Sequence, residues 1–475
     1  MDVYDNFNFQ LRTAAEQFKK IDKKEVIRLI SHLDADGISA SSIMIKLMNN
    51  EGRRYSVSIV QQLNRAVLSQ LVLEPYNCFV FTDIGSGALE DMKELFVGKK
   101  VFILDHHSIP EGSGDLSSDI VFVNPHICGI DGGKEISGAG VVYMFSCCVD
   151  SSMEEMAHIA IVGAIGDLQE QNGFLHLNEE ILRKAIEKNK IKVTKGLRIF
   201  GAQTKPLHKA LEYCTDPYIP GVSGSESGAI QFLCQIGIEP KNSSGWKKIV
   251  NLDEEEMKKL VTGIILKRLN ETNPDDVLGN LYTLPHEEEE NPTRDAKEFA
   301  TLLNACGRLG RSSLGIGACL GDKKIKKEAI KSLSDYKKEI VSALTWYNEN
   351  KFSDDVFWGN GFVIINAKKN VMSTMIGTLA SILSKSNLMA NNKFIISMAQ
   401  LPEGNTKISL RTTGNADGLL DLKKIIDHII QNVANAESGG HQNAAGAVIP
   451  SDSELQFIES TKEVLVKYAV EEKVV

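Results

Sequence analysis

The sequence contains no apolar run of the roughly 18 residues that a membrane-spanning helix requires. Its first ten residues, MDVYDNFNFQ, lack the basic and then apolar pattern of a secretory signal. None of the eight cysteines forms a CxxC pair, so the common zinc and dithiol motifs are excluded and free thiols are favoured. We therefore expect a soluble cytoplasmic protein with no membrane partner.

An excess of positive charge is also missing, because the formal net charge is −9. This balance disfavours a protein that coats nucleic acid over its whole surface, although it permits a local basic groove beside an acidic site. The length of 475 residues is too great for one ordinary core. We expect two or three domains.

Short apolar runs, separated by helix-like segments, dominate the first 200 residues. Continuous apolar strands alternating with helices indicate a parallel sheet with helices on both faces. The sequence therefore predicts an α/β domain over residues 1–200. Its expected strands are VIRLI (26–30), YSVSIV (55–60), CFVFT (78–82), VFIL (101–104) and VFV (121–123).

The remaining chain divides into a helical connector or insertion over 201–292 and a smaller α/β domain over 293–475. In the connector, Asp253 is the expected N-cap of a helix that begins after Leu252. The run HEEEENP (286–292) is interpreted as a solvated linker. The third domain has expected helices near 323–348, 374–384 and 420–433, and expected strands at 362–366, 394–400 and 407–412.

Four acidic or histidine-bearing motifs each close an apolar segment within the first 170 residues. Three of them follow expected strands, and ligands gather at the carboxyl ends of parallel strands. The mixture of carboxylates and imidazoles suits Mn²⁺ or Mg²⁺ in phosphoryl chemistry, which indicates a two-metal hydrolase. The motifs are SHLDADG (31–37), TDIG (82–85), LDHH (104–107) and GAIGD (163–167).

Each motif also has a purely structural alternative. His32, Asp34 and Asp36 alternate by two and would point to one side of an extended chain, but the aspartates could equally cap a helix. Asp83 could bridge two cations or occupy a turn. Adjacent histidines behind a buried strand favour function, and Asp167 after a helix needs a compensating cation.

The order HxDxDG, D, DHH, GxxGD resembles the DHH phosphoesterases, and ESGGHQNAAGAVIP (437–450) resembles the signature of the companion DHHA1 domain. Within this family the chain is most similar to archaeal RecJ-like proteins of the GINS-associated nuclease type. The resemblance implies an exonuclease that hydrolyses single-stranded DNA, and also RNA, to mononucleotides in DNA replication or repair. A 5′ to 3′ direction is expected, although no residue of the sequence sets it.

The resemblance also implies two divalent cations, with Mn²⁺ preferred to Mg²⁺, and the GINS complex of the replicative helicase as a partner. His107 would face the scissile phosphate, and Asp105 would orient a histidine or a bound water. The implied metal ligands are His32 and Asp34 for one cation, Asp36, His106 and Asp167 for the other, and Asp83 as the bridge.

The substrate end is expected in the third domain. There Ser438, Gly439, Gly440 and His441 would form a loop that cradles a phosphate, with Arg411 as its charged partner. A tight packing turn is the alternative, and Ser438 stands where the family pattern often has glycine. Arg308 and Arg311 lie either along the nucleic-acid path or on a solvated helix face.

Three other functions compete with the exonuclease. A phosphodiesterase for short oligoribonucleotides or cyclic dinucleotides would use the same metals and the same C-terminal segment. A GINS-bound replisome scaffold would not need catalysis, yet every expected ligand type is present. An inorganic pyrophosphatase is less favoured, because that branch of the family carries a different C-terminal domain.

Overall fold

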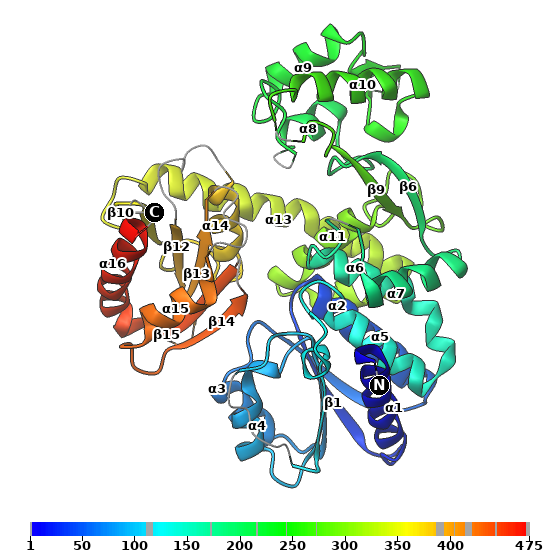
Figure 1. The fold of residues 1–475 in the computed structure, drawn as a ribbon, viewed down its shortest axis with the longest axis vertical. Helices are drawn as coiled ribbons and strands as arrows, with labels where there is room; N and C mark the ends of the chain where they lie inside the picture. Colours follow the sequence, from blue (N-terminus) through cyan, green and yellow to red (C-terminus); the bar gives the residue numbers. More distant parts are fainter. Residues whose placement is uncertain are drawn as a thin grey trace. The chain divides into compact units, whose positions relative to one another are not determined.

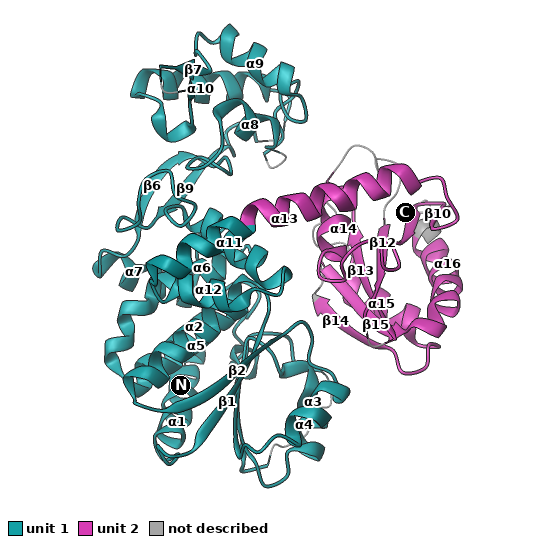
Figure 2. Ribbon diagram, turned by 180° about the vertical axis from the view of Figure 1, so that it is seen from behind, with its two compact units in different colours: residues 1–332 teal, residues 333–475 magenta. Residues whose placement is uncertain are grey.

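The computed structural model describes residues 2–110, 117–171, 173–214, 217–243, 245–271, 273–385, 394–402, 404–413, 420–441 and 444–471. The chain forms two compact units, residues 1–332 and residues 333–475 (Figure 2). Each unit has its own sheet and its own core. Within the described residues, no helix has both the length and the apolar character needed to cross a membrane.

A five-stranded parallel sheet in the order β2-β1-β3-β4-β5 forms the base of the first unit, which confirms the expected α/β architecture. Helices α3 and α4 bury leucines and a methionine against one face, while α2 and α5 contact the other. The elements are α1 (Val3–Lys19), β1 (Val26–His32), α2 (Ala35–Asn50), β2 (Arg54–Val60), α3 (Arg65–Val72), β3 (Cys78–Thr82), α4 (Leu89–Leu95), β4 (Lys100–Leu104), β5 (Ile120–Val123) and α5 (Gly138–Val149).

Four further helices of this unit pack in the same region, with α6 against α2 and α7 against α6. Helix α11 packs against both α2 and α6, and α12 packs against α2, because the apolar side chains of α11 are buried there. Residues 293–332, which the sequence analysis placed in the third domain, therefore belong to the first compact unit. The helices are α6 (Ala157–Gly166), α7 (His176–Glu187), α11 (Ala296–Arg308) and α12 (Ser312–Cys319).

An inserted subdomain extends from this unit on an antiparallel ribbon of β6 and β9 (Figure 1). Its three helices enclose a separate apolar core, and α10 begins after the N-cap Asp253, as the sequence predicts. The elements are β6 (Lys192–Leu197), α8 (Leu207–Glu212), α9 (Glu226–Gln235), β7 (Lys241–Asn242), β8 (Gly245–Trp246), α10 (Glu254–Lys267) and β9 (Leu278–Thr283).

The acidic run at 286–292 is a largely exposed turn inside the first unit rather than a linker between the units. Glu287 lies 2.6 Å from the ammonium of Lys326, and Glu290 lies 2.8 Å from that of Lys248. These ion pairs hold the turn against its neighbours. The boundary between the two units falls instead within helix α13 (Lys323–Asn350).

The second unit contains a mixed six-stranded sheet in the order β10-β11-β12-β13-β15-β14. Helix α14 packs on one face, and α15 and α16 pack on the other. Its elements are β10 (Val356–Gly359), β11 (Phe362–Asn366), α14 (Ile376–Ser384), β12 (Phe394–Gln400), β13 (Asn405–Thr412), α15 (Leu422–Ile430), β14 (Glu437–His441), β15 (Ala444–Pro450) and α16 (Glu454–Glu471).

Candidate metal centre

Asp83 occupies the first position after β3, at the carboxyl edge of the parallel sheet. Its backbone adopts a left-handed conformation with φ of 57°, which is uncommon and costly for a residue with a side chain. A Cβ at Gly138, the first residue of α5, would lie 2.4 Å from Asp83 Oδ1. Gly138 therefore leaves the space that this carboxylate occupies.

His106 lies at the centre of the cluster and is buried. Its Nε2 atom is 3.3 Å from Asp83 Oδ1, 3.3 Å from Asp167 Oδ2 and 3.7 Å from Asp36 Oδ2. Its Nδ1 atom is 2.7 Å from the Gly132 carbonyl oxygen, which can accept a hydrogen bond only if Nδ1 carries the proton. Nε2 is thus the atom left to bind a cation or a second proton.

Burial alone would lower the pKa of His106, but the carboxylates of Asp83, Asp167 and Asp36 outweigh it and raise the pKa well above the usual range. In the metal-free chain, a proton on Nε2 therefore compensates part of the negative charge. A divalent cation between the imidazole and the carboxylates would compensate more of it.

His32 and Asp34 approach Asp83 from the end of β1. His32 Nδ1 lies 2.8 Å from Asp34 Oδ2 and 3.7 Å from Asp83 Oδ2. The other oxygen of Asp34 accepts a hydrogen bond of 3.0 Å from the amide of Gly37 and caps helix α2. The capping and ligand interpretations of Asp34 are therefore compatible, because they use different oxygens.

Asp36, in the first turn of α2, is fully buried and faces the amino end of helix α5. Its two oxygens accept hydrogen bonds of 2.6 and 3.1 Å from the amides of Gly138 and Ala139. Burial, followed by the nearby Asp83 carboxylate, raises the pKa of Asp36 to about 8. Burial and the charge of Asp36 likewise raise the pKa of Asp167, the C-cap of α6, well above its usual range.

The donor set fits divalent cations. Among the residues that the structure describes, the oxygens of Asp83 and Nε2 of His106 make no hydrogen bond, and their contacts are ion pairs of 3.3 Å or more. Unpartnered buried polar atoms are costly, and a hard cation with carboxylate and imidazole ligands would satisfy them. The three groups whose ligand atoms lie within 4.8 Å of one another are His32, Asp34 and Asp83; Asp36, His106 and Asp167; and Asp83, His106 and His107.

His107 is held by Asp105 rather than by the carboxylate cluster. Asp105 Oδ1 lies 2.7 Å from His107 Nδ1 and accepts a hydrogen bond from the His106 amide, while Oδ2 accepts one from the Ser86 amide. His107 Nδ1 is 4.0 Å from Asp83 Oδ1. Burial opposes protonation of His107, but Asp105 outweighs it and raises its pKa.

Several supporting residues were not found by sequence reasoning. Gln169 donates to the Gly132 carbonyl that orients His106, and Asn178 donates to Gln169. Asn124 follows strand β5 and donates to the His107 carbonyl at 2.9 Å. Asn124 directly follows an apolar strand, as the residues of the other motifs do, and this position is the signal that could have identified it.

Residues 438–440 do not form the expected loop: they lie in the edge strand β14 and pair with β15. The Ser438 hydroxyl donates to Asp427 and accepts a hydrogen bond of 3.0 Å from Lys423. Both partners lie on helix α15, so the hydroxyl is engaged in holding β14 to this helix. Gly440 has φ of 121°, and a Cβ there would contact the Ala444 carbonyl oxygen at 2.3 Å. The side chain of His441 and residues 442–443 lie outside the described part of the chain.

Arg411 lies on β13 of the same sheet. It donates to the Ser381 hydroxyl and to the carbonyls of Leu410 and Ala445. Because Ala445 pairs with Gly440, the structure brings Arg411 and Gly440 to the same end of the second sheet. In the first unit, Arg308 ends helix α11, and Arg311 donates to the Ser332 hydroxyl at 3.4 Å.

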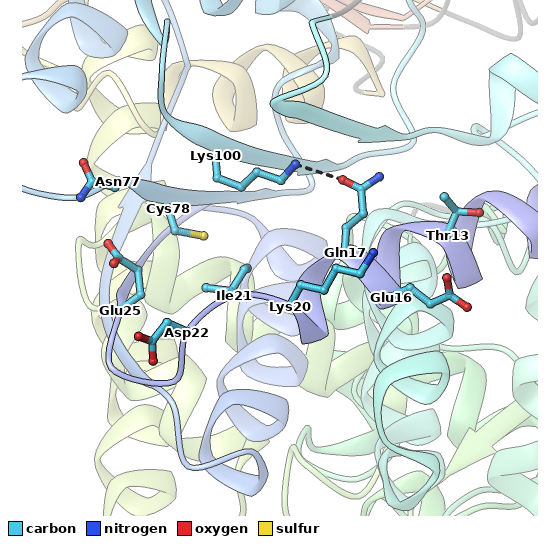
Figure 3. A pocket seen from close by; sticks show the side chains of 10 residues that line it. All are labelled: Thr13, Glu16, Gln17, Lys20, Ile21, Asp22, Glu25, Asn77, Cys78 and Lys100. Carbon is cyan, nitrogen blue, oxygen red and sulfur yellow. Dashed lines mark hydrogen bonds between the residues drawn. The ribbon is translucent and has the colours of Figure 1, made fainter.

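A hollow of about 610 Å³ lies at the amino edge of the parallel sheet (Figure 3). Cys78 and Lys100, the first residues of β3 and β4, line it, and Lys100 donates to Gln17 at 3.0 Å. The candidate metal centre lies at the carboxyl ends of the same strands. The hollow is therefore separate from it.

Three family models match successive segments of the chain. They describe the DHH family N-terminal domain (26–165), the DHH-CID domain (199–281) and the DHHA1 domain (360–467). An uncharacterized protein of Methanocaldococcus jannaschii is 31% identical over 458 residues, which cover 95% of this chain and 96% of that protein.

Two solved structures share the fold. CDC45 from Entamoeba histolytica matches with a TM-score of 0.64 and 12% identity, over 96% of this chain and 99% of CDC45. RecJ from Thermus thermophilus, solved with Mn²⁺, matches with a TM-score of 0.58 and 15% identity, over 97% of this chain and 55% of RecJ. At these identities the likeness concerns the fold.

Proposed function

Because the chain belongs to the DHH/DHHA1 phosphoesterase family, we propose that it is a two-metal exonuclease that acts on single-stranded DNA and also accepts RNA. The observation that carries the proposal is the buried cluster around Asp83, whose oxygens make no hydrogen bond to a described residue and face His106 and His32 at ion-pair distances of 3.3 and 3.7 Å. A phosphodiesterase for short oligoribonucleotides or cyclic dinucleotides is the alternative within the same chemistry.

In this proposal, His32 and Asp34 would hold one cation, and Asp83 would contribute to both. Asp36, His106 and Asp167 would hold the other, consistent with the grouping of their ligand atoms. When bound, Mn²⁺ or Mg²⁺ supplies Lewis-acid stabilisation of the phosphate and lowers the pKa of water. Gly132 and Asp105 keep the two imidazoles in fixed orientations through hydrogen bonds to their Nδ1 atoms.

His107 is the proposed acid. Its raised pKa favours the imidazolium form, in which Nδ1–H donates to Asp105 and Nε2 carries the second proton. An imidazolium can neutralise charge that develops on the phosphate or protonate the leaving oxygen. Asp105, whose oxygens are engaged by backbone amides and by His107, acts through His107 as a positioning residue.

We assign recognition of the strand end to the second unit. Arg411 offers positive charge at the sheet end where Gly440 pairs with Ala445, and a Cβ at Gly439 would meet nothing within 4 Å. The exposed Gly440 beside a guanidinium suits an approaching phosphate. Ser438 is expected to hold β14 to helix α15 rather than to contact substrate.

The test is degradation of 5′-labelled and 3′-labelled single-stranded DNA and RNA in Mn²⁺. We expect mononucleotide release by the unaltered protein and a loss of at least about a hundredfold in Asp83→Asn, because the shared carboxylate is removed. Asp119→Asn, a change at an exposed carboxylate, is the matched control. Intact polymers in the presence of a folded protein that binds Mn²⁺ would contradict the nuclease, and cleavage confined to di- and trinucleotides would favour the alternative.

A second candidate role is binding to the GINS complex of the replicative helicase. It rests on the resemblance to archaeal RecJ-like proteins, and the fold shared with CDC45 is compatible with it. We expect co-purification with GINS from the same source. Absence of a complex at micromolar concentrations of both components would count against this role.

A further inference from the structure

The turn that carries Asp34 and Asp36 is held by a side chain from a distant part of the sequence. Ala35 lies between these two aspartates and begins helix α2, so its amide has no partner within the helix. Asn304 Oδ1, on helix α11, accepts a hydrogen bond of 3.0 Å from this amide. Asn304 follows Ala35 by 269 residues.

The same face of α11 touches this turn a second time. Gly307 follows Asn304 by three residues, and a Cβ at Gly307 would lie 1.6 Å from the carbonyl oxygen of Leu33. Any side chain there would push the helix away from the turn. The glycine therefore brings the backbone of α11 into direct contact with the segment before Asp34, at the distance that lets Asn304 reach Ala35.

Helix α6 confines the turn from another direction. A Cβ at Gly166 would lie 2.7 Å from the Ala35 Cβ, and one at Gly163 would lie 2.4 Å from Asp36 Oδ1. The turn is therefore packed between α6 and α11, both of which approach it through glycine. Within this packing, the hydrogen bond that the Ala35 amide donates to Asn304 is directional and sets the orientation of the Ala35 peptide.

We propose that Asn304 is a positioning residue for the metal centre, which sets Asp34 and Asp36 in the geometry that binds two cations. The inference rests on the proposed metal site. Without the acceptor, the Ala35 amide loses its partner and the peptide between the two aspartates can rotate, which misplaces both carboxylates together. Residues that orient ligands in this way commonly contribute about tenfold or more to metal affinity.

The experiment measures Mn²⁺ binding to the full-length protein by titration calorimetry. Asn304→Leu keeps the volume and removes the acceptor, Asn304→Ala removes it without adding bulk, and Asn304→Asp keeps an oxygen for Ala35. Thr301→Ala is the matched control, because Thr301 lies on the same helix and its hydroxyl donates to the Lys297 carbonyl. We expect about tenfold weaker Mn²⁺ binding in the Leu and Ala variants. Asn304→Asp is expected to bind at least as tightly as the unaltered protein, and Thr301→Ala is expected to be unchanged.

A second measurement separates positioning from general damage. On single-stranded oligonucleotides, we expect kcat to fall in Asn304→Ala at saturating substrate while KM stays within about twofold, because substrate contacts are unaltered. Unchanged Mn²⁺ affinity in either folded variant without the acceptor would overturn the inference, as would equal weakening in Asn304→Asp. Absence of Mn²⁺ binding in the unaltered protein would instead contradict the metal site itself, and binding without cleavage would contradict only the nuclease.

Discussion

At the scale of single residues, the buried carboxylates of the candidate site need protons or a cation to offset their negative charge. Asp36 is buried near the carboxylate of Asp83, and these two causes, burial first, raise the pKa of Asp36 to about 8. At neutral pH the metal-free site therefore retains a proton that a bound cation must displace. Asp167, whose pKa is raised by the same kinds of cause, adds to this effect.

We predict that the affinity for Mn²⁺ rises with pH through the range around 8 in which Asp36 loses its proton. Below this pKa the protonated Asp36 competes with the cation, so each displaced proton weakens binding by about tenfold per pH unit. Calorimetric titrations in two buffers with different ionisation enthalpies measure the number of protons released. A constant affinity between pH 6 and pH 9, with no proton release, would contradict the compensation argument.

Helix α11 links two parts of the first unit at the scale of secondary structure. Near its beginning, Glu298 accepts hydrogen bonds from the Gln203 amide at 3.0 Å and from the Thr204 hydroxyl, both in the inserted subdomain. Near its end, Asn304 bonds to the turn between the metal-site aspartates. Burial raises the pKa of Glu298 to about 7, so this anchor titrates near neutral pH.

We predict that Glu298 makes the stability of the first unit depend on pH. Its folded pKa exceeds the ordinary value of 4.5, so the folded state takes up a proton as pH falls from about 7 toward 4.5. The free energy of unfolding, relative to Glu298→Gln, should therefore rise by about 1 to 3 kcal/mol from pH 8 to pH 5.

Urea unfolding of the first unit at both pH values measures this difference. Glu239→Gln, at an exposed position of the inserted subdomain, is the control and should follow the unaltered protein at both pH values. If the difference in free energy of unfolding between Glu298→Gln and the unaltered protein is the same at both pH values, Glu298 is not the group that titrates.

The features predicted from the sequence are those with local causes. The strands β11 and β12 begin and end where their apolar runs do, and the acidic motifs follow β1, β3 and β4 as expected. The contact between Asn304 and Ala35 has no local signal, since it depends on how two distant helices pack. Strand β14 was missed because Ser-Gly-Gly has weak strand propensity and pairs only through its partner β15.

The whole chain divides into two units with separate cores, joined within helix α13. The first unit holds all of the candidate metal ligands that the structure brings together, whereas the second holds Arg411 and β14. Cation binding is therefore expected to stabilise the folded state of the first unit and not that of the second. Units with their own cores can unfold in separate steps, which makes this difference measurable.

We predict two thermal transitions, of which Mn²⁺ raises only the one that belongs to the first unit. At a free Mn²⁺ concentration of about 100 times its Kd, ligand linkage stabilises the folded form by about 2.7 kcal/mol for each independent site. EDTA should remove the shift, and Asp83→Asn should abolish it while leaving the transition of the second unit in place. Scanning calorimetry of the full-length protein, with hydrogen exchange to assign each transition to its unit, makes the measurement. An equal shift of both transitions would show that the cation acts on more than the cluster around Asp83.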